Sequence, residues 1–106
     1  MYSKELLKGT LQTIVLKLLS DHGKMYGYEI SQKVKSLSDD TLVITEGALY
    51  PTLHKLEAEG LVRAETENVN NRTRKYYSLT PKGEKESDNR MSDFREYIDL
   101  MKNLFY

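Results

Sequence analysis

The apolar residues of this chain change their spacing twice along the sequence, and this change limits the possible folds more than any other feature. Between residues 5 and 59 they recur every three or four positions in three separate stretches, as they do on one face of an α-helix. After Gly60, residues 61–67 and 74–80 form two short stretches with Val, Thr and Tyr, which favour strands. Helical spacing then returns and continues almost to Tyr106. We therefore expect a mostly α chain with a small β-hairpin before its last helix.

The first two helices are predicted from stripes of apolar residues. The first covers residues 5–20, and Gly23 follows it where a C-terminal cap would lie. Its inward residues are Leu7, Leu11, Ile14, Val15, Leu18 and Leu19. The second helix has no Ser, Thr or Asp cap. Its inward stripe is Tyr26, Ile30, Val34 and Leu37.

The third helix is predicted to begin after Thr45, because a capping residue is followed there by an acidic one. Gly60 ends this helix. Its inward residues are Leu49, Leu53 and Leu56. Pro51 lacks the N–H that would bond back to Gly47, so we expect a local distortion of the helix rather than its end.

The last helix carries an apolar seam. Residues 68–73 are polar and are predicted to form the hairpin tip, after which Thr80 and Pro81 cap and open the helix. Its apolar residues step by three, four, three and four positions: Met91, Phe94, Ile98, Met101 and Phe105. A helix of about 25 residues spans ~37 Å, more than a small helical unit covers. We expect part of the seam to pack on a second copy; the alternative is packing on the chain's own first helix alone.

Composition excludes several classes of function. The 106 residues suit one compact unit, and 16 basic residues balance 16 acidic ones, so attraction to nucleic acid must come from local arrangement. The absence of Cys removes disulfides and thiolate chemistry. No nucleotide-binding or hydrolase motif is present, and His22 and His54 lack carboxylates at a metal-ligand spacing. We expect no enzyme activity, no cofactor and no metal.

Two further observations concern location. No segment approaches the ~20 apolar residues that would span a bilayer, and the first residues do not resemble a signal peptide. A cytoplasmic protein is therefore expected.

The hairpin has a local excess of positive charge. Residues 61–81 contain four basic side chains, Arg63, Arg72, Arg74 and Lys75, against the two acidic ones Glu65 and Glu67. Those near the tip alternate with Asn and Tyr, which hydrogen-bond sugars or base edges, whereas phosphates attract the cations. A charged tip that is simply solvated is the alternative. Because a helix pair precedes the hairpin, the order is that of a winged helix-turn-helix, whose second helix enters a major groove.

Four stretches of the sequence together resemble one known family. They are residues 7–11 (LKGTL), 26–30 (YGYEI), 46–57 (EGALYPTLHKLE) and 74–80 (RKYYSLT). In this order and spacing, from about Leu6 to Gly83, the chain resembles the PadR family of bacterial transcriptional regulators, in its short-tailed form with one C-terminal helix. The resemblance implies a winged helix-turn-helix DNA-binding domain over residues 1–80 and a C-terminal dimerisation helix over residues 81–106. It also implies a repressor that binds a roughly palindromic operator as a homodimer.

The resemblance further implies which residues meet these partners. Those expected to face double-stranded DNA are Tyr28, Thr45, Gly47, Ala48, Tyr50, Thr52, Lys55, Asn71, Arg72, Arg74 and Lys75. Those expected at the dimer interface are Leu7, Leu11, Met91, Phe94, Ile98, Met101 and Phe105. For Tyr50 the alternative is a ring packed under the second helix with only its hydroxyl exposed. Tyr77 and Leu79 share strand parity and are expected to face inward.

An effector and a second function stay open at this point. Some relatives bind flat aromatic compounds between subunits through Trp, which this chain lacks. A small aromatic effector, or simply the interface core, would account for Tyr2, Phe94, Tyr97, Phe105 and Tyr106. The tip at residues 69–71 departs from the family's glycine-rich pattern. The zero net charge favours the alternative function, a winged-helix module that binds another protein without specific DNA binding.

Overall fold

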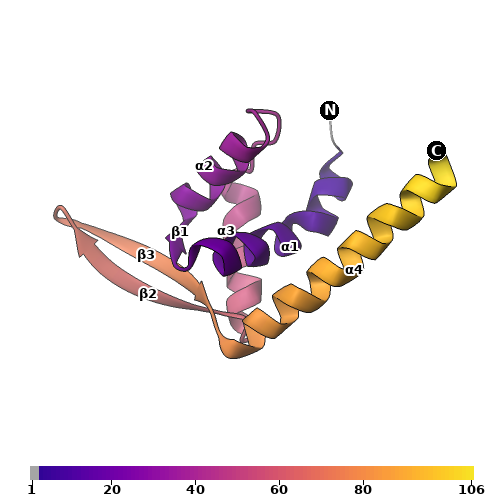
Figure 1. The fold of residues 1–106 in the computed structure, drawn as a ribbon. Helices are drawn as coiled ribbons and strands as arrows, with labels where there is room; N and C mark the ends of the chain where they lie inside the picture. The colour runs from indigo at the N-terminus through magenta and orange to yellow at the C-terminus, as the bar shows by residue number, and fades with distance from the viewer. Residues whose placement is uncertain (1–2) are drawn as a thin grey trace.

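The computed structural model describes residues 3–106, which form four helices and a three-stranded sheet (Figure 1). In chain order the elements are α1 (Lys4–His22), β1 (Met25–Tyr26), α2 (Gly27–Leu37), α3 (Glu46–Ala58), β2 (Val62–Val69), β3 (Arg72–Leu79) and α4 (Pro81–Phe105). The predicted class, mostly α with a small hairpin, is confirmed. Within these residues no helix combines the length and apolar character needed to cross a bilayer.

Side-chain caps fix the starts of three helices. Ser3 Oγ accepts from the N–H of Leu6 (3.1 Å) at α1, and Thr45 Oγ1 accepts from the N–H of Ala48 (3.2 Å) at α3. At α2, the Glu29 carboxylate accepts from the N–H of Tyr26 (3.1 Å) instead. The third helix continues through Pro51, as predicted from the sequence.

The sheet corrects two details of the prediction. Its strand order is β1-β3-β2, all antiparallel, and β1 pairs Met25 with Tyr77 and Tyr26 with Tyr76. Two residues are too short a stretch to show a strand pattern, so β1 was not predicted. The hairpin tip is also shorter than the expected residues 68–73, because only Asn70 and Asn71 lie between the strands. Both have positive φ (51° and 64°), which Asn tolerates in tight hairpin turns.

The core lies where α1, α2, α3 and the sheet meet. Its fully buried side chains include Val15, Leu16, Ile30, Leu49, Leu53, Leu56 and Tyr77. Tyr77 and Leu79 face inward as predicted, but Leu37 was wrongly placed in the inward stripe of α2 and is 70% exposed. It is the last residue of α2, where the helix has already passed the core.

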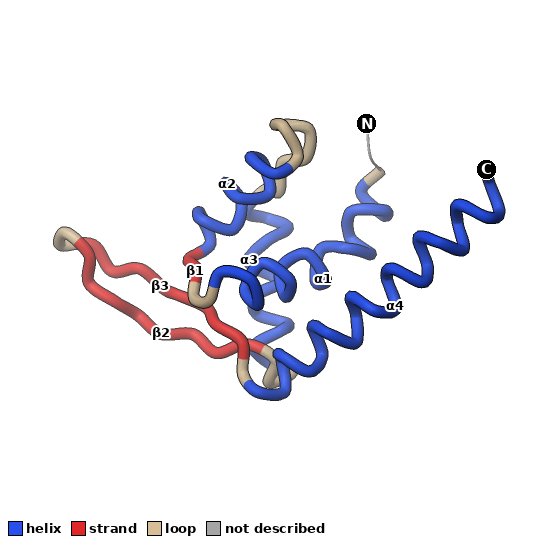
Figure 2. The backbone as a smooth tube through the Cα atoms, in the orientation of Figure 1, coloured by secondary structure: helices blue, strands red, loops and turns tan. Residues whose placement is uncertain are grey.

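Helix α4 is attached tightly at its start and projects at its end. Thr80 caps it by accepting from the N–H of Gly83 (3.0 Å), and a Cβ at Gly83 would overlap the carbonyl oxygen of Leu61. Farther along, Ser87 is buried and Arg90 Nη1 donates to Gln12 Oε1 of α1 (2.6 Å). Beyond this point α4 diverges from α1 (Figure 2). Only its first half is therefore covered by the chain's own helices.

Candidate nucleic-acid interface

Helix α3 presents a face that begins at Gly47 to solvent. Leu49, Leu53 and Leu56 fix its inward side, and at 100° per residue the opposite side is centred on Gly47, Pro51 and His54. All three of these are exposed. Because Gly47 has no side chain, this end of the helix can approach the floor of a major groove closely.

Two α3 residues expected to face DNA lie on the flank of the helix nearest α1. Ala48 and Thr52 are half-buried, and the Thr52 hydroxyl donates to the carbonyl of Ala48 (3.0 Å). Both line a groove shared with α1 residues, among them Lys4 and Lys8. Thr45 borders the same groove and is exposed, whereas Lys55 is exposed farther along α3.

Tyr50 occupies the other flank of α3 and packs against the start of α2. A Cβ added to Gly27 would lie 2.5 Å from the Tyr50 hydroxyl oxygen and 2.8 Å from the ring carbon that bears it. The side chain is 36% exposed. Tyr50 therefore packs with its hydroxyl end against Gly27, which makes room for it, whereas the alternative considered had only the hydroxyl exposed.

The base of the wing, the β2–β3 hairpin, is held by an aromatic cluster. The Tyr26 ring stacks on Tyr28 (centroids 6.4 Å apart) and meets Tyr76 edge-on (5.4 Å). The guanidinium of Arg74 lies 4.6 Å from the Tyr26 centroid, so this cation contacts the helix-turn-helix and not only solvent. Tyr28 is 63% exposed at the edge of the cluster.

Lys24 adds an ion pair to this base. Its Nζ lies 2.7 Å from Glu67 Oε2 and 5.2 Å from the Tyr76 centroid. The hydrogen bond to Glu67 raises the pKa of the Lys24 ammonium. The charge of Glu67 is thus offset by Lys24. Glu67 is one of the two acidic residues that reduce the net positive charge of the hairpin.

The remaining wing cations are exposed near the tip. Arg72 opens β3 and Lys75 lies on the opposite face of the strand, 5.6 Å from the Tyr77 centroid. Neither forms an ion pair with any residue in 3–106. Asn71 is exposed in the turn beside them. Arg72, Lys75 and Asn71 are thus accessible to phosphate and sugar groups.

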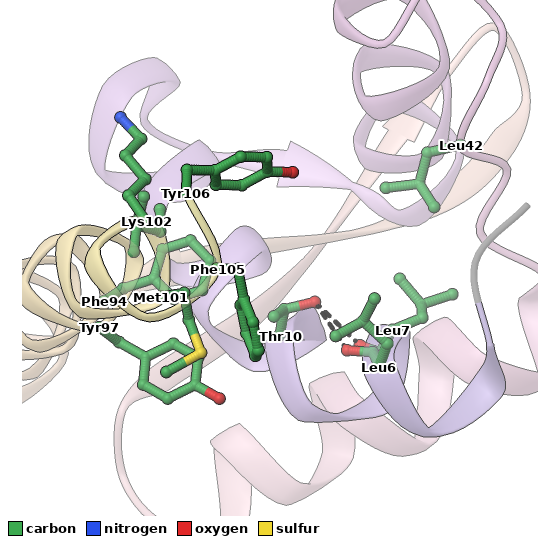
Figure 3. Close-up of a pocket in the computed structure, with 11 residues that line it drawn as sticks. Leu6, Leu7, Thr10, Leu42, Phe94, Tyr97, Met101, Lys102, Phe105 and Tyr106 are labelled. Atoms are coloured by element: carbon green, nitrogen blue, oxygen red, sulfur yellow. Dashed lines mark hydrogen bonds between the residues drawn. The ribbon is translucent and has the colours of Figure 1, made fainter.

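The predicted dimer residues surround an apolar groove between α1 and the projecting half of α4. The groove has a volume of about 540 Å³ and includes Leu7, Phe94, Ile98, Met101 and Phe105 (Figure 3). Met91 lines a smaller apolar hollow beside Phe94, on the α1 side. Placing Leu11 at this interface was wrong: it is 4% exposed and belongs to the core of the single chain.

The groove also gathers the other aromatic residues considered for an effector. Tyr97 and Tyr106 line it with Phe94 and Phe105, whereas Tyr2 lies outside the described residues. No group of three or more His, Asp or Glu residues in positions 3–106 is arranged to hold a metal ion.

Four surface residues near α3 were not singled out from the sequence as DNA contacts. Pro51 and His54 follow from the helical phase of the Leu stripe, a signal that was present in the sequence. Lys4 and Lys8 lie near α3 only because of how α1 packs, which no local pattern shows.

Comparison with known proteins gives one family for this arrangement. The model of the transcriptional regulator PadR-like family matches residues 15–89, a range that includes α2, α3 and the wing. The transcriptional regulator Rv3488 of Mycobacterium tuberculosis is 34% identical over 80 residues, covering 76% of this chain and 71% of that protein.

Solved structures extend the likeness to the whole chain. A transcriptional regulator from Clostridium thermocellum has a TM-score of 0.89 at 28% identity and covers 100% of both chains. A PadR family transcriptional regulator from Eggerthella lenta has a TM-score of 0.78 at 33% identity and covers 94% of this chain and 85% of its own. The predicted winged helix-turn-helix with one C-terminal helix is therefore confirmed.

Proposed function

The chain belongs to the transcriptional regulator PadR-like family, and we propose that it acts as a homodimeric repressor on a pseudo-palindromic operator. As a member of this family it is a DNA-binding transcriptional regulator and not an enzyme. A dimer presents two copies of α3 and of the wing, which suit the two half-sites of a symmetric operator. Occupancy of such a site beside a promoter would block transcription, and because transcription occurs on the chromosome we place the protein in the cytoplasm.

One observation carries the DNA contacts: the exposed face of α3 lies on the same domain as a wing whose cations Arg72 and Lys75 form no ion pair within residues 3–106. In our proposal Gly47 allows close approach in the major groove and His54 reads base edges there. Arg72 and Lys75 contact phosphates beside it, with Asn71 at the turn. Thr45, Tyr50, Lys55 and Tyr28 border this surface, and Ala48 and Thr52 line its α1 side.

Arg74 has a different part in this proposal. Because its guanidinium lies over Tyr26, it fixes the wing against the start of α2 and offers only its outer edge to a phosphate. The wing is then held at a defined angle to α3. Such a fixed angle is needed if α3 and the wing are to contact the same duplex.

Dimerisation follows from the uncovered apolar end of α4. Ile98 is 38% exposed and Phe105 is 73% exposed, and both line the groove toward α1. A partner's α1 and α4 would cover this surface, which is large and apolar for a monomer. We thus assign residues 1–80 to DNA binding and residues 81–106 to dimerisation.

The same groove suits release by a small aromatic ligand. A volume of about 540 Å³ lies within the usual range for ligand sites, and its aromatic lining favours flat apolar compounds. A ligand there would contact both α1 and α4 and could change the distance between the two copies of α3.

Fluorescence anisotropy tests the proposal. A duplex from upstream of the coding region and a scrambled duplex are titrated across a salt series. Saturable binding that is tighter for the native duplex and weakens steeply with salt is expected. Equally weak binding of every duplex at all salt concentrations would instead favour the protein-interaction module. A promoter–reporter assay then distinguishes repression, the expected direction, from activation.

A further inference from the structure

Helix α1 has two different sides. One side, with Leu6 and Thr10, lines the apolar groove toward α4. The other carries Lys4 and Lys8, one helical turn apart, and faces the first two turns of α3. We propose that this second groove, of about 600 Å³, holds a DNA backbone strand beside the major groove that α3 enters. This inference rests on the proposed DNA binding and adds a contact surface to it.

The lining of the groove fits a phosphate backbone. Lys4 and Lys8 of α1 line it together with Thr45 and Thr52 of α3 and the apolar side chains of Leu7, Leu11 and Val43. The two Thr hydroxyls bond to the backbone of Ala48, so the lysine ammonium groups are the free polar groups of the lining. No carboxylate lines it, although Glu5 and Glu46 are neighbours in sequence. Lysine ammonium groups are among the side-chain groups that contact phosphate oxygens. The adjacent N-terminal end of α3 adds a partial positive charge.

The two lysines are available for such a contact. Both are exposed, and within residues 3–106 neither forms an ion pair. Lys17 of the same helix differs, because it is bound to Asp21 at 2.9 Å. At positions i and i+4 their Cβ atoms are about 5–6 Å apart, so both can reach phosphates of one strand.

The position of the groove ties it to the α3 surface. Gly47 and Pro51 belong both to the exposed face of α3 and to the groove lining. A duplex seated on that face therefore brings one of its backbones along α1, while the wing contacts the duplex elsewhere. DNA would be held at two separate places, which restricts rotation of α3 in the major groove.

Replacing both lysines tests this surface. Each lost phosphate contact lowers the slope of log K against log salt by about 0.9, so Lys4→Ala with Lys8→Ala is expected to lower it by about 2 for each bound protomer. Affinity should fall for native and random duplexes alike, because backbone contacts carry no sequence information. The matched control removes two exposed lysines elsewhere, Lys35→Ala with Lys85→Ala, and should keep the wild-type slope. Lys4→Arg with Lys8→Arg should keep it as well.

The outcomes separate this inference from the proposed function. If the wild-type protein binds DNA and the double alanine variant keeps its affinity and slope, the α1 groove is not a DNA contact, and the proposed function stands. If the double variant and the control lose the same slope, the effect is one of net charge and the groove is again excluded. If the wild type binds no duplex even at low salt, both proposals fail together. Far-UV circular dichroism of each variant verifies that it is folded.

Discussion

The wing and the end of α4 both project from the core, but they expose opposite chemistry. The wing is held by its own strand ladder and by the Tyr26 cluster, and its exposed tip carries polar and charged groups. The end of α4 exposes Ile98, Leu104 and Phe105, and the C-terminal part of this helix projects from the rest of the fold (Figure 1). A polar projection is stable in water and suits a charged partner, whereas an apolar one is stabilised by covering it. In the proposed function, the first therefore binds DNA and the other binds a second protein chain.

The largest effect is expected from a charge placed in the α4 seam. Ile98→Asp puts a carboxylate into the proposed interface, where an unpaired buried charge costs several kcal/mol. We expect the dissociation constant of the dimer to rise by more than about 100-fold, because each 1.4 kcal/mol changes this constant tenfold. Light scattering across a dilution series measures it. Glu96→Lys, which changes a charge at an exposed position of the same helix, is the control. An Ile98→Asp protein that stays dimeric would contradict the claim that the end of α4, unlike the wing, binds a second chain.

Gly83→Ala disturbs the point where α4 joins the hairpin. The new Cβ would overlap the Leu61 carbonyl oxygen, so the start of α4 has to shift. We expect a loss of about 1–3 kcal/mol in the free energy of unfolding, seen as a lower midpoint in urea. Gly9→Ala is the control, because nothing lies within 4 Å of a Cβ there. Equal midpoints for the two variants would show that α4 is not held as described.

Variants of two wing arginines separate stabilisation of the wing from contact with DNA. Arg74→Ala loses the contact with Tyr26, and a lower midpoint of thermal unfolding is expected. Arg72→Ala should leave stability unchanged and lower the salt slope of DNA binding by about 0.9. Thermal unfolding of both variants measures the contribution of each arginine to stability, and fluorescence anisotropy measures its contact with phosphate. Identical behaviour of the two variants would contradict the separate parts given to them.

The smallest expected effect is a change in the stability of the protein at alkaline pH, and it arises at the base of the wing. Burial raises the pKa of the Tyr77 phenol above its ordinary value of 10.0. A raised pKa in the folded state means that the contribution of this group to stability is complete below pH 10.0 and is lost as the pH rises through the folded-state value. Tyr77→Phe should therefore lose less stability than the wild type between neutral and strongly alkaline pH. Urea midpoints measured across that range provide the test.

Elements with a strong local signal could be predicted from the sequence. The Leu stripe and the Thr45 cap give α3, and Thr80 with Pro81 gives the start of α4. Asn70 and Asn71 carried a turn signal as well, but the longer polar stretch around them concealed how far the strands extend.

Features made by distant parts of the chain could not be predicted. Strand β1 exists only because Met25 and Tyr26 meet β3, and Arg74 reaches Tyr26 only through that pairing. Lys8 adjoins Thr52 because α1 packs across α3. Leu11 was expected at the dimer interface from the family resemblance, but the fold buries it in the core of the single chain. Local periodicity states which side of a helix is apolar, but not which neighbour covers it.

The mass of the protein–DNA complex tests the two assignments together. Sedimentation of a labelled upstream duplex with the wild-type chain should give one duplex with two chains. Arg72→Ala with Lys75→Ala should leave a free dimer beside free DNA at the same salt concentration. A complex with a single chain, or an unchanged complex for the wing variant, would contradict the account in which the polar projection binds DNA and the apolar one binds a second copy.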